Sequence, residues 1–366
     1  MMAALIIFGA LCVCIAPFVP ALVELVTSSD AKPLVVVREQ DANIRHFAAS
    51  FFEQIQSFYA NHDIDPLNPP EPFRDAFGQR GSAVFLGAAQ KPHFTAAEQQ
   101  ARRSTDVLIS TGDLMLEGDF VFEQEIYCGR QLYAGSNNTY RAVYAGTDLI
   151  LGPNSTVARW LHSQGHVYIG QDSRVFGRIS SASSITLAAG VFFERLNANI
   201  IRFESDTLVN VLPTLEHDQQ VAWEIPPKAL QIDAKTLLFD RSLRLPENTE
   251  AAHNIVSKGE LFLGAGCRVS GNLKAHGRLE IGASSIVRGS LVSEDEIWVG
   301  PASLVMGPIV SERRVIIDAR CVIGAPKIPT SVTAPIVEVA VGSEICGTLW
   351  ASREGKVFLD KNESGN

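Results

Sequence analysis

A fixed period of 18 residues constrains the fold of this chain more than any other feature of its 366 residues. Aliphatic residues that open an aliphatic-x-aliphatic pattern recur at this spacing in two series: Leu149, Val167 and Ile185, then Leu243, Leu261, Leu279, Ile297 and Val315. A short fixed period is typical of solenoids, in which each repeat packs only against its neighbours. The sequence therefore predicts a stack of similar units.

Each unit has six positions that favour burial. Counted from the first aliphatic residue, positions 1, 3, 9 and 13 are aliphatic, position 7 is small, and position 15 is Ser or Ala. Three such pairs predict three short strands that alternate in and out before turning a corner. We expect an all-β fold, a β-helix of triangular coils, with these core columns: Leu261, Leu263, Val269, Leu273, Leu279, Ile281, Val287, Leu291, Ile297, Val299, Val305 and Ile309.

Glycine recurs at positions 4 and 11 of the unit, where corners are expected. A bend favours backbone angles that a Cβ resists, so we interpret these glycines as corner residues and not as a phosphate-binding loop. The predicted corner glycines are Gly152, Gly170, Gly264, Gly271, Gly282, Gly289, Gly300 and Gly307.

The period divides the chain into a first β-helix block at 106–203 and a second at 241–360, followed by a tail at 361–366. The period is lost in the connector at 204–240, which holds three prolines. Within the first block, Ile126–Gly129 reads as a unit whose successor starts 23 residues later, which predicts a five-residue bulge at Gly135–Thr139. The pattern is compatible with one interrupted coil and with two separate stacks.

The N-terminus has the composition of a membrane anchor. Residues 1–23 carry no charged side chain and are long enough to cross the hydrocarbon core as a helix. No basic residue precedes the apolar stretch, and Pro17 and Pro20 lie near any cleavage site, which favours an uncleaved anchor over a signal peptide. We expect a transmembrane helix at 1–25. Basic residues that follow it favour a cytoplasmic location for the rest of the chain.

A short amphipathic helix is expected at 41–60. Ile44, Phe47, Phe51, Ile55 and Phe58 recur at intervals of three and four residues, which places them on one face of a helix. This face could lie on a membrane, bind a partner or cover the end of the β-stack. Asp41 is the expected N-cap, and Pro66 would prevent the helix from continuing. The proline-rich residues 61–105 are expected to form a linker.

Composition excludes several kinds of function. Lys and Arg number 31 against 40 Asp and Glu, so the chain has no electrostatic basis for binding nucleic acid through its phosphates. Six cysteines are too scattered for a disulfide framework or a zinc site, and we expect small buried thiols. We therefore predict no metal, no cofactor and no catalytic residue.

Residues 261–350 resemble the bactofilins, the polymer-forming cytoskeletal proteins of bacteria. The resemblance rests on Gly271-Asn-Leu-Lys-Ala275 and Val287-Arg-Gly-Ser-Leu291, repeated on the 18-residue unit. It implies a right-handed β-helix that polymerises end to end without nucleotide and serves as a scaffold at the bacterial inner membrane. The partners implied are other copies of the chain, the membrane and other envelope proteins.

A physical argument independent of the family also favours self-association. The end of a solenoid exposes unpaired strand edges, which pair with other strands unless they are covered. Residues 243–357 contain 12 basic and 12 acidic residues, so this block is neutral and has no net repulsion between copies. We expect a non-enzymatic scaffold, anchored in the membrane, that assembles through its β-helix ends.

Two other functions are compatible with a β-helix. Hexapeptide acyltransferases build triangular coils and use a loop histidine as general base. From the sequence, however, no histidine is expected beside a carboxylate in a loop, and His162, His166 and His276 are expected on the solvated surface. A secreted carbohydrate-acting β-helix would favour a column of acidic residues on one face, and the repeat contains none.

Overall fold

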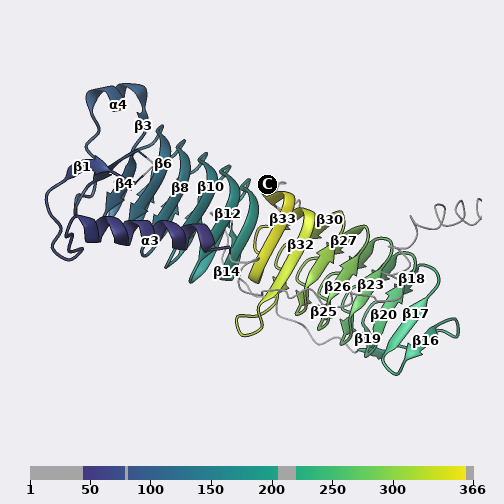
Figure 1. Cartoon of the computed structure of the whole chain (residues 1–366). Coiled ribbons are helices and arrows are strands. Elements are labelled where there is room, and N and C mark those ends of the chain that lie inside the picture. Colours follow the sequence, from purple (N-terminus) through teal and green to yellow (C-terminus); the bar gives the residue numbers. More distant parts are fainter. Residues whose placement is uncertain (1–43, 79–80, 205–219, 360–366) are drawn as a thin grey trace, which may run out of the picture. The chain divides into compact units, whose positions relative to one another are not determined.

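The computed structural model describes residues 44–78, 81–204 and 220–359. These residues form a β-solenoid of about 13 turns with one long helix beside it (Figure 1). The predicted β-helix is therefore confirmed at the level of a solenoid. The predicted anchor at 1–25 and the tail at 361–366 lie outside the described residues. Within the described part of the chain, no helix is long and apolar enough to cross a membrane.

The first block contains fourteen strands. They are β1 (Phe73–Ala76), β2 (Ser82–Phe85), β3 (Arg103–Ser104), β4 (Val107–Ser110), β5 (Leu114–Leu116), β6 (Val121–Cys128), β7 (Leu132–Ala134), β8 (Thr139–Ala145), β9 (Leu149–Leu151), β10 (Thr156–Ser163), β11 (Val167–Ile169), β12 (Arg174–Ser181), β13 (Ser184–Ala188) and β14 (Phe192–Glu204). From β2 to β13, each strand pairs in parallel with its equivalent one coil further along the chain.

The register in the first block differs from the predicted one at one place. Ile126 lies in β6 and pairs with Val143, whereas Leu132 in β7 pairs with Leu149, 17 residues away. Ile126–Gly129 therefore belongs to another side of the coil, which has a similar aliphatic and glycine pattern. The predicted five-residue bulge at Gly135–Thr139 is wrong, because that coil is one residue shorter than the repeat.

The second block follows the predicted period closely. Its strands are β15 (Val221–Ala222), β16 (Leu230–Asp233), β17 (Thr236–Phe239), β18 (Leu243–Leu245), β19 (Thr249–Ala251), β20 (Asn254–Ser257), β21 (Leu261–Leu263), β22 (Arg268–Val269), β23 (Leu273–Ala275), β24 (Leu279–Ile281), β25 (Ile286–Val287), β26 (Leu291–Ser293), β27 (Glu296–Val299), β28 (Leu304–Val305), β29 (Ile309–Ser311), β30 (Arg314–Ile317), β31 (Val322–Ile323), β32 (Thr330–Ala340) and β33 (Glu344–Phe358). The twelve core-column residues named above are each no more than 4% exposed.

The corner glycines are required for a reason that the sequence pattern did not indicate. All eight have φ outside the left-handed region. A Cβ on any of them would instead lie 2.2–2.7 Å from backbone atoms of the preceding coil. Glycine is therefore required at these positions because successive coils approach each other closely. The backbone angles of the bend would not by themselves exclude a side chain.

The residues with left-handed backbone angles lie at position 6 of the unit, two residues after the glycine of position 4. Eleven coils have a residue there with φ between +55° and +82°. They are Asp119, Asn137, Asn154, Asp172, Gly190, Asn248, Gly266, Ser284, Ala302, Arg320 and Gly342. Gly, Asn and Asp tolerate this conformation best, which explains the composition of the column.

The predicted amphipathic helix is α3 (His46–Asn61), which lies along the flank of the first block. Its buried residues Phe51 and Ile55 pack against Tyr127, Tyr144 and Trp160, which point outward from the coils. The helix therefore covers a side of the stack and not its end. Arg45 precedes it without a side-chain cap, the predicted N-cap at position 41 lies outside the described residues, and the helix ends well before Pro66.

Residues 61–105 are not a simple linker. They contain β1, β2 and the short helix α4 (Ala96–Ala101), and β3 starts at Arg103. The expected connector at 204–240 likewise contains β15, β16 and all of β17, while residues 205–219 lie outside the description. β2 and β3 pair in parallel with strands of the first block, and β15 and β17 pair in parallel with strands of the second.

The two blocks meet at their C-terminal ends. β14, the last strand of the first block, pairs antiparallel with β33, the last strand of the second (Figure 1). The pairing extends from Phe192↔Lys356 to Arg202↔Glu344. The chain thus forms two separate stacks joined tail to tail, which resolves the alternatives left open by the repeat pattern.

Candidate functional site at the ends of the coils

A solenoid block has two rims, the outermost coils whose strand edges have no further coil to pair with. Rims are where a β-solenoid can join another strand, so they are the candidate site in this chain. The core columns and corner glycines do not themselves form the site; they stack the coils and thereby determine where the rims lie. With two blocks, the described residues present four rims.

Two rims are closed against each other at the β14–β33 joint. Leu196 faces Leu349 across the joint, and both are fully buried. The Asn197 side chain donates a hydrogen bond to Thr348 Oγ1 at 2.9 Å, and the Arg195 guanidinium lies 4.1 Å from the Trp350 ring centroid. The joint therefore has a buried apolar centre and specific polar contacts.

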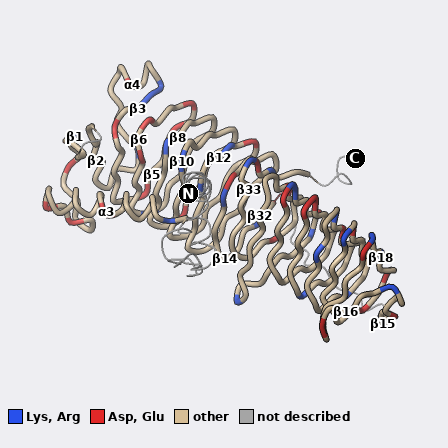
Figure 2. The backbone as a smooth tube through the Cα atoms, turned by 45° about the vertical axis from the view of Figure 1, so that its right-hand side comes forward, with Lys and Arg blue, Asp and Glu red and all other residues tan. Residues whose placement is uncertain are grey.

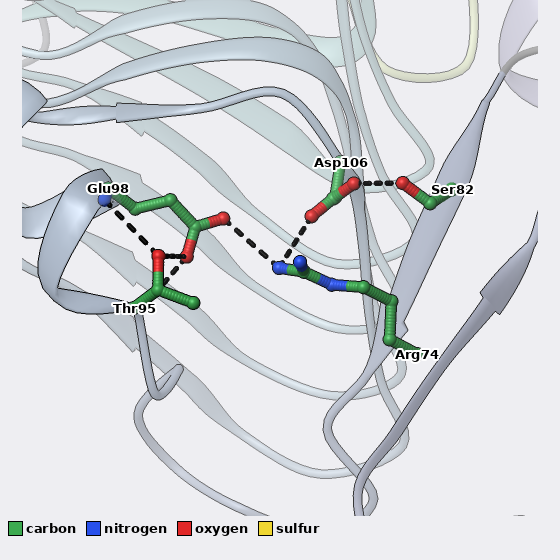
Figure 3. A network of polar contacts seen from close by, with 5 residues as sticks. All are labelled: Arg74, Ser82, Thr95, Glu98 and Asp106. Carbon is green, nitrogen blue, oxygen red and sulfur yellow. Dashed lines mark hydrogen bonds and ion pairs between the residues drawn. The ribbon is translucent and has the colours of Figure 1, made fainter.

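The N-terminal rim of the first block is capped by its own chain. β1 pairs antiparallel with β2, and Arg74 of β1 binds Glu98 of α4 at 3.1 Å and Asp106 at 2.8 Å (Figure 3). Asp106 also accepts a hydrogen bond from Ser82, and Thr95 caps α4 through a reciprocal bond with Glu98. Burial raises the pKa of Glu98, but the bonds from Thr95 and Arg74 lower it overall, which keeps the carboxylate charged.

The other side chains of β1 are also engaged. Phe73 lies 5.1 Å from Phe85 between ring centroids, and His62, the C-cap residue of α3, bonds Asp75 at 2.9 Å. The backbone N–H of Ala76 donates to the Asp75 carboxylate at 2.7 Å. An edge strand that carries paired charges and a partly used backbone is a poor template for another strand.

The N-terminal rim of the second block differs. There β15 pairs with β19, β16 with β17 and β18 with β21, and no strand among the described residues pairs with their outer edges. Four aliphatic side chains at this end are 45–63% exposed, namely Val221, Ile225, Leu230 and Ile232. We call this end, formed by β15, β16 and β18, the open rim.

The cysteine thiols among the described residues are buried. The described cysteines Cys128, Cys267, Cys321 and Cys346 are buried free thiols, and burial raises the pKa of each. Cys12 and Cys14 lie outside the described residues. Within the described ranges, no group of three or more His, Cys, Asp and Glu side chains could hold a metal ion.

Two histidines form pairs with carboxylates, and a third is buried although it was expected on the surface. His62 pairs with Asp75, and His276 pairs with Glu294 at 2.9 Å. The expectation from the sequence concerned only a pair in a loop insertion typical of catalysis. Both pairs are exposed and contribute little to stability. His162 was expected on the solvated surface but is only 3% exposed, because α3 covers it.

A groove of about 750 Å³ lies on the outside of the second block. Its lining residues bind one another: the Arg278 guanidinium lies 5.5 Å from the Trp298 ring centroid, Trp298 Nε1–H donates to Asp318 at 2.8 Å, and Arg314 pairs with Glu338. These contacts link side chains of successive coils on the outer surface of the block.

Comparison with known proteins does not add a function. No protein-family model, curated protein or solved structure matches the chain. The candidate site therefore rests on the geometry of the rims. The repeat predicts that rims exist, but it carries no signal for which of them are covered, because the covering contacts join residues as far apart as Phe192 and Lys356.

Proposed function

We propose that this protein is a non-enzymatic scaffold that associates with copies of itself through solenoid rims and is anchored to a membrane by residues 1–25. The observation that carries the proposal is the open rim, whose outer strand edges have no partner among the described residues and which carries four exposed aliphatic side chains. Exposed aliphatic edge strands are rare in soluble monomers because they template pairing with another chain.

Two further observations support the proposal. The β14–β33 joint is an example, within this chain, of two rims joined by antiparallel pairing. Charges of both signs are interspersed along the second block, which is neutral over residues 243–357, so its copies do not repel each other (Figure 2). The resemblance of residues 261–350 to bactofilins points to the same function, a bacterial inner-membrane scaffold.

The test is the mass of the full chain in mild detergent, measured by size-exclusion chromatography with light scattering over a wide range of protein concentration. We expect assemblies of more than one copy that form without nucleotide and dissociate on dilution. A single copy at every concentration would contradict the proposal.

The membrane anchor has its own test. Deletion of residues 1–25 is expected to move the protein from the membrane fraction to the soluble fraction of cells, because the charge-free stretch is removed. If the shortened chain stays with the membrane, another part of the protein holds it there.

A further inference from the structure

We infer that association through the open rim is two-fold and stops at two copies, with β16 of one copy paired antiparallel to β16 of the other. This inference rests on the proposed function and adds to it the surface that makes the contact and the reason that assembly ends. The partner is a second copy of this chain.

Three of the four rims of the described residues are covered. The C-terminal rims of both blocks are joined to each other, and the N-terminal rim of the first block is capped by the Arg74 network. Only the open rim is left among the described residues. A chain with one self-complementary surface forms a closed pair, whereas a filament needs two surfaces on each copy.

The outermost strands of the two blocks, β16 and β1, contrast with each other. Both pair antiparallel with the next strand, so both have one outer edge. The charged side chains of β1 are in ion pairs. In β16, Leu230 and Ile232 are more than half exposed, and the register with β17 shifts between Gln231 and Asp233. Pairing with a second β16 would place these side chains against aliphatic side chains of the other copy and cover part of their exposed surface.

The symmetry of the pair and the charge of the rim are compatible with contact between two copies. In an antiparallel pair of identical strands related by a two-fold axis, residue i of one copy faces residue j of the other and residue j faces residue i, so the surface complements itself. Residues 220–245, which include the open rim, carry four basic and three acidic residues, so the net charge is only +1 and repulsion between two copies is small. The β14–β33 joint uses the same antiparallel arrangement.

The experiment uses the full chain with Cys12→Ser and Cys14→Ser, since the four remaining cysteines are buried. Gln231→Cys, near the expected two-fold axis, should form a disulfide-linked dimer on mild oxidation. Leu67→Cys is the matched control, because Leu67 is 96% exposed but lies between α3 and β1, outside β15, β16 and β18. It should give no specific dimer.

A second pair of variants tests the apolar contact. Leu230→Lys combined with Ile232→Lys should lower the mass from two copies to one, while Leu67→Lys should leave it at two. All three residues are exposed, so the fold should be retained, as circular dichroism would verify. Growth beyond two copies would overturn closure, and an unchanged mass in the double variant, or no Gln231→Cys dimer, would overturn the choice of rim. Self-association would stand in each case. A wild-type chain that is always a single copy would instead overturn the proposed function.

Discussion

Single residues at the corners determine how closely successive coils can stack. The sequence pattern located the glycines of positions 4 and 11, but the physical reason was visible only in the structure, because a contact between coils involves residues about 18 positions apart. The left-handed column at position 6 could have been found from its Asn, Asp and Gly content. Ser284, Ala302 and Arg320 obscure it, since these residues rarely adopt positive φ.

Gly289→Ala is expected to lower the free energy of unfolding by about 1–3 kcal/mol, because its Cβ would lie 2.2 Å from the carbonyl oxygen of Gly271. Gly112→Ala is the control, since its Cβ would have only ordinary contacts at 3.4 Å or more and φ is not positive. Urea unfolding should show a clear loss for the first variant and none for the second. Equal effects would contradict the role of close approach.

Ala302→Gly is expected to raise the free energy of unfolding by up to about 1 kcal/mol. Ala302 has φ +58°, a conformation that costs a non-glycine residue about 1–2 kcal/mol, and the entropy of the added glycine offsets part of the gain. Ala283→Gly, at a neighbouring corner position without positive φ, should be destabilising. A loss of stability in both variants would show that φ does not limit position 302.

At the scale of elements, α3 was predictable as a helix but its location was not. Its 3.6-residue period is local, whereas its binding surface is formed by Tyr127, Tyr144 and Trp160 from three different coils. The signal in the sequence was that outward positions of the first block are aromatic where the second block has residues such as Lys274. A helix that covers the flank of a stack requires such an apolar outer face.

His162 makes the contact between α3 and the solenoid sensitive to acid. Burial, reinforced by the charge of Arg45, lowers the pKa of His162 to about 4, and its Nδ1 bonds Ser180 Oγ at 2.8 Å. In the unfolded chain this group titrates near 6.5. Its contribution to stability is therefore complete above pH 6.5 and is lost as the pH falls from 6.5 toward 4, with a loss of about 2 kcal/mol at pH 5.

His162→Gln should remove this pH dependence, because glutamine can bond Ser180 but does not titrate. The measurement is the difference in unfolding free energy between pH 7 and pH 5 for wild type and variant. Hydrogen bonding to Asp75 raises the pKa of His62, which favours the folded state at acid pH, but this effect is common to both proteins and cancels. Parallel pH profiles would contradict the assignment to His162.

At the scale of the whole molecule, the repeat predicted the coils but not their tail-to-tail arrangement. β14 and β33 are separated by most of the second block, and no local pattern specifies that they pair. The nearest sequence signal is the long aperiodic connector, which lets the chain start the second block away from the end of the first. The rims therefore had to be observed before the free one could be identified.

The cap on the first block is expected to limit the number of copies in an assembly. Arg74→Ala would leave Asp106, which is almost completely buried, without its cation and would loosen β1 and α4 from the first coil. A second rim would then be accessible, so each copy would have two surfaces and assembly would continue beyond two copies. The measurement is light scattering of the full chain against concentration.

Arg313→Ala is the matched control for the cap, because Arg313 pairs with Asp295 on the exposed surface of the second block, away from every rim. It should leave assembly at two copies. Adding Leu230→Lys and Ile232→Lys to the Arg74→Ala chain should reduce the long assemblies to pairs joined through the uncapped rim. If Arg74→Ala stays at two copies while its cap is shown by proteolysis to be open, the cap is structural only and does not limit assembly.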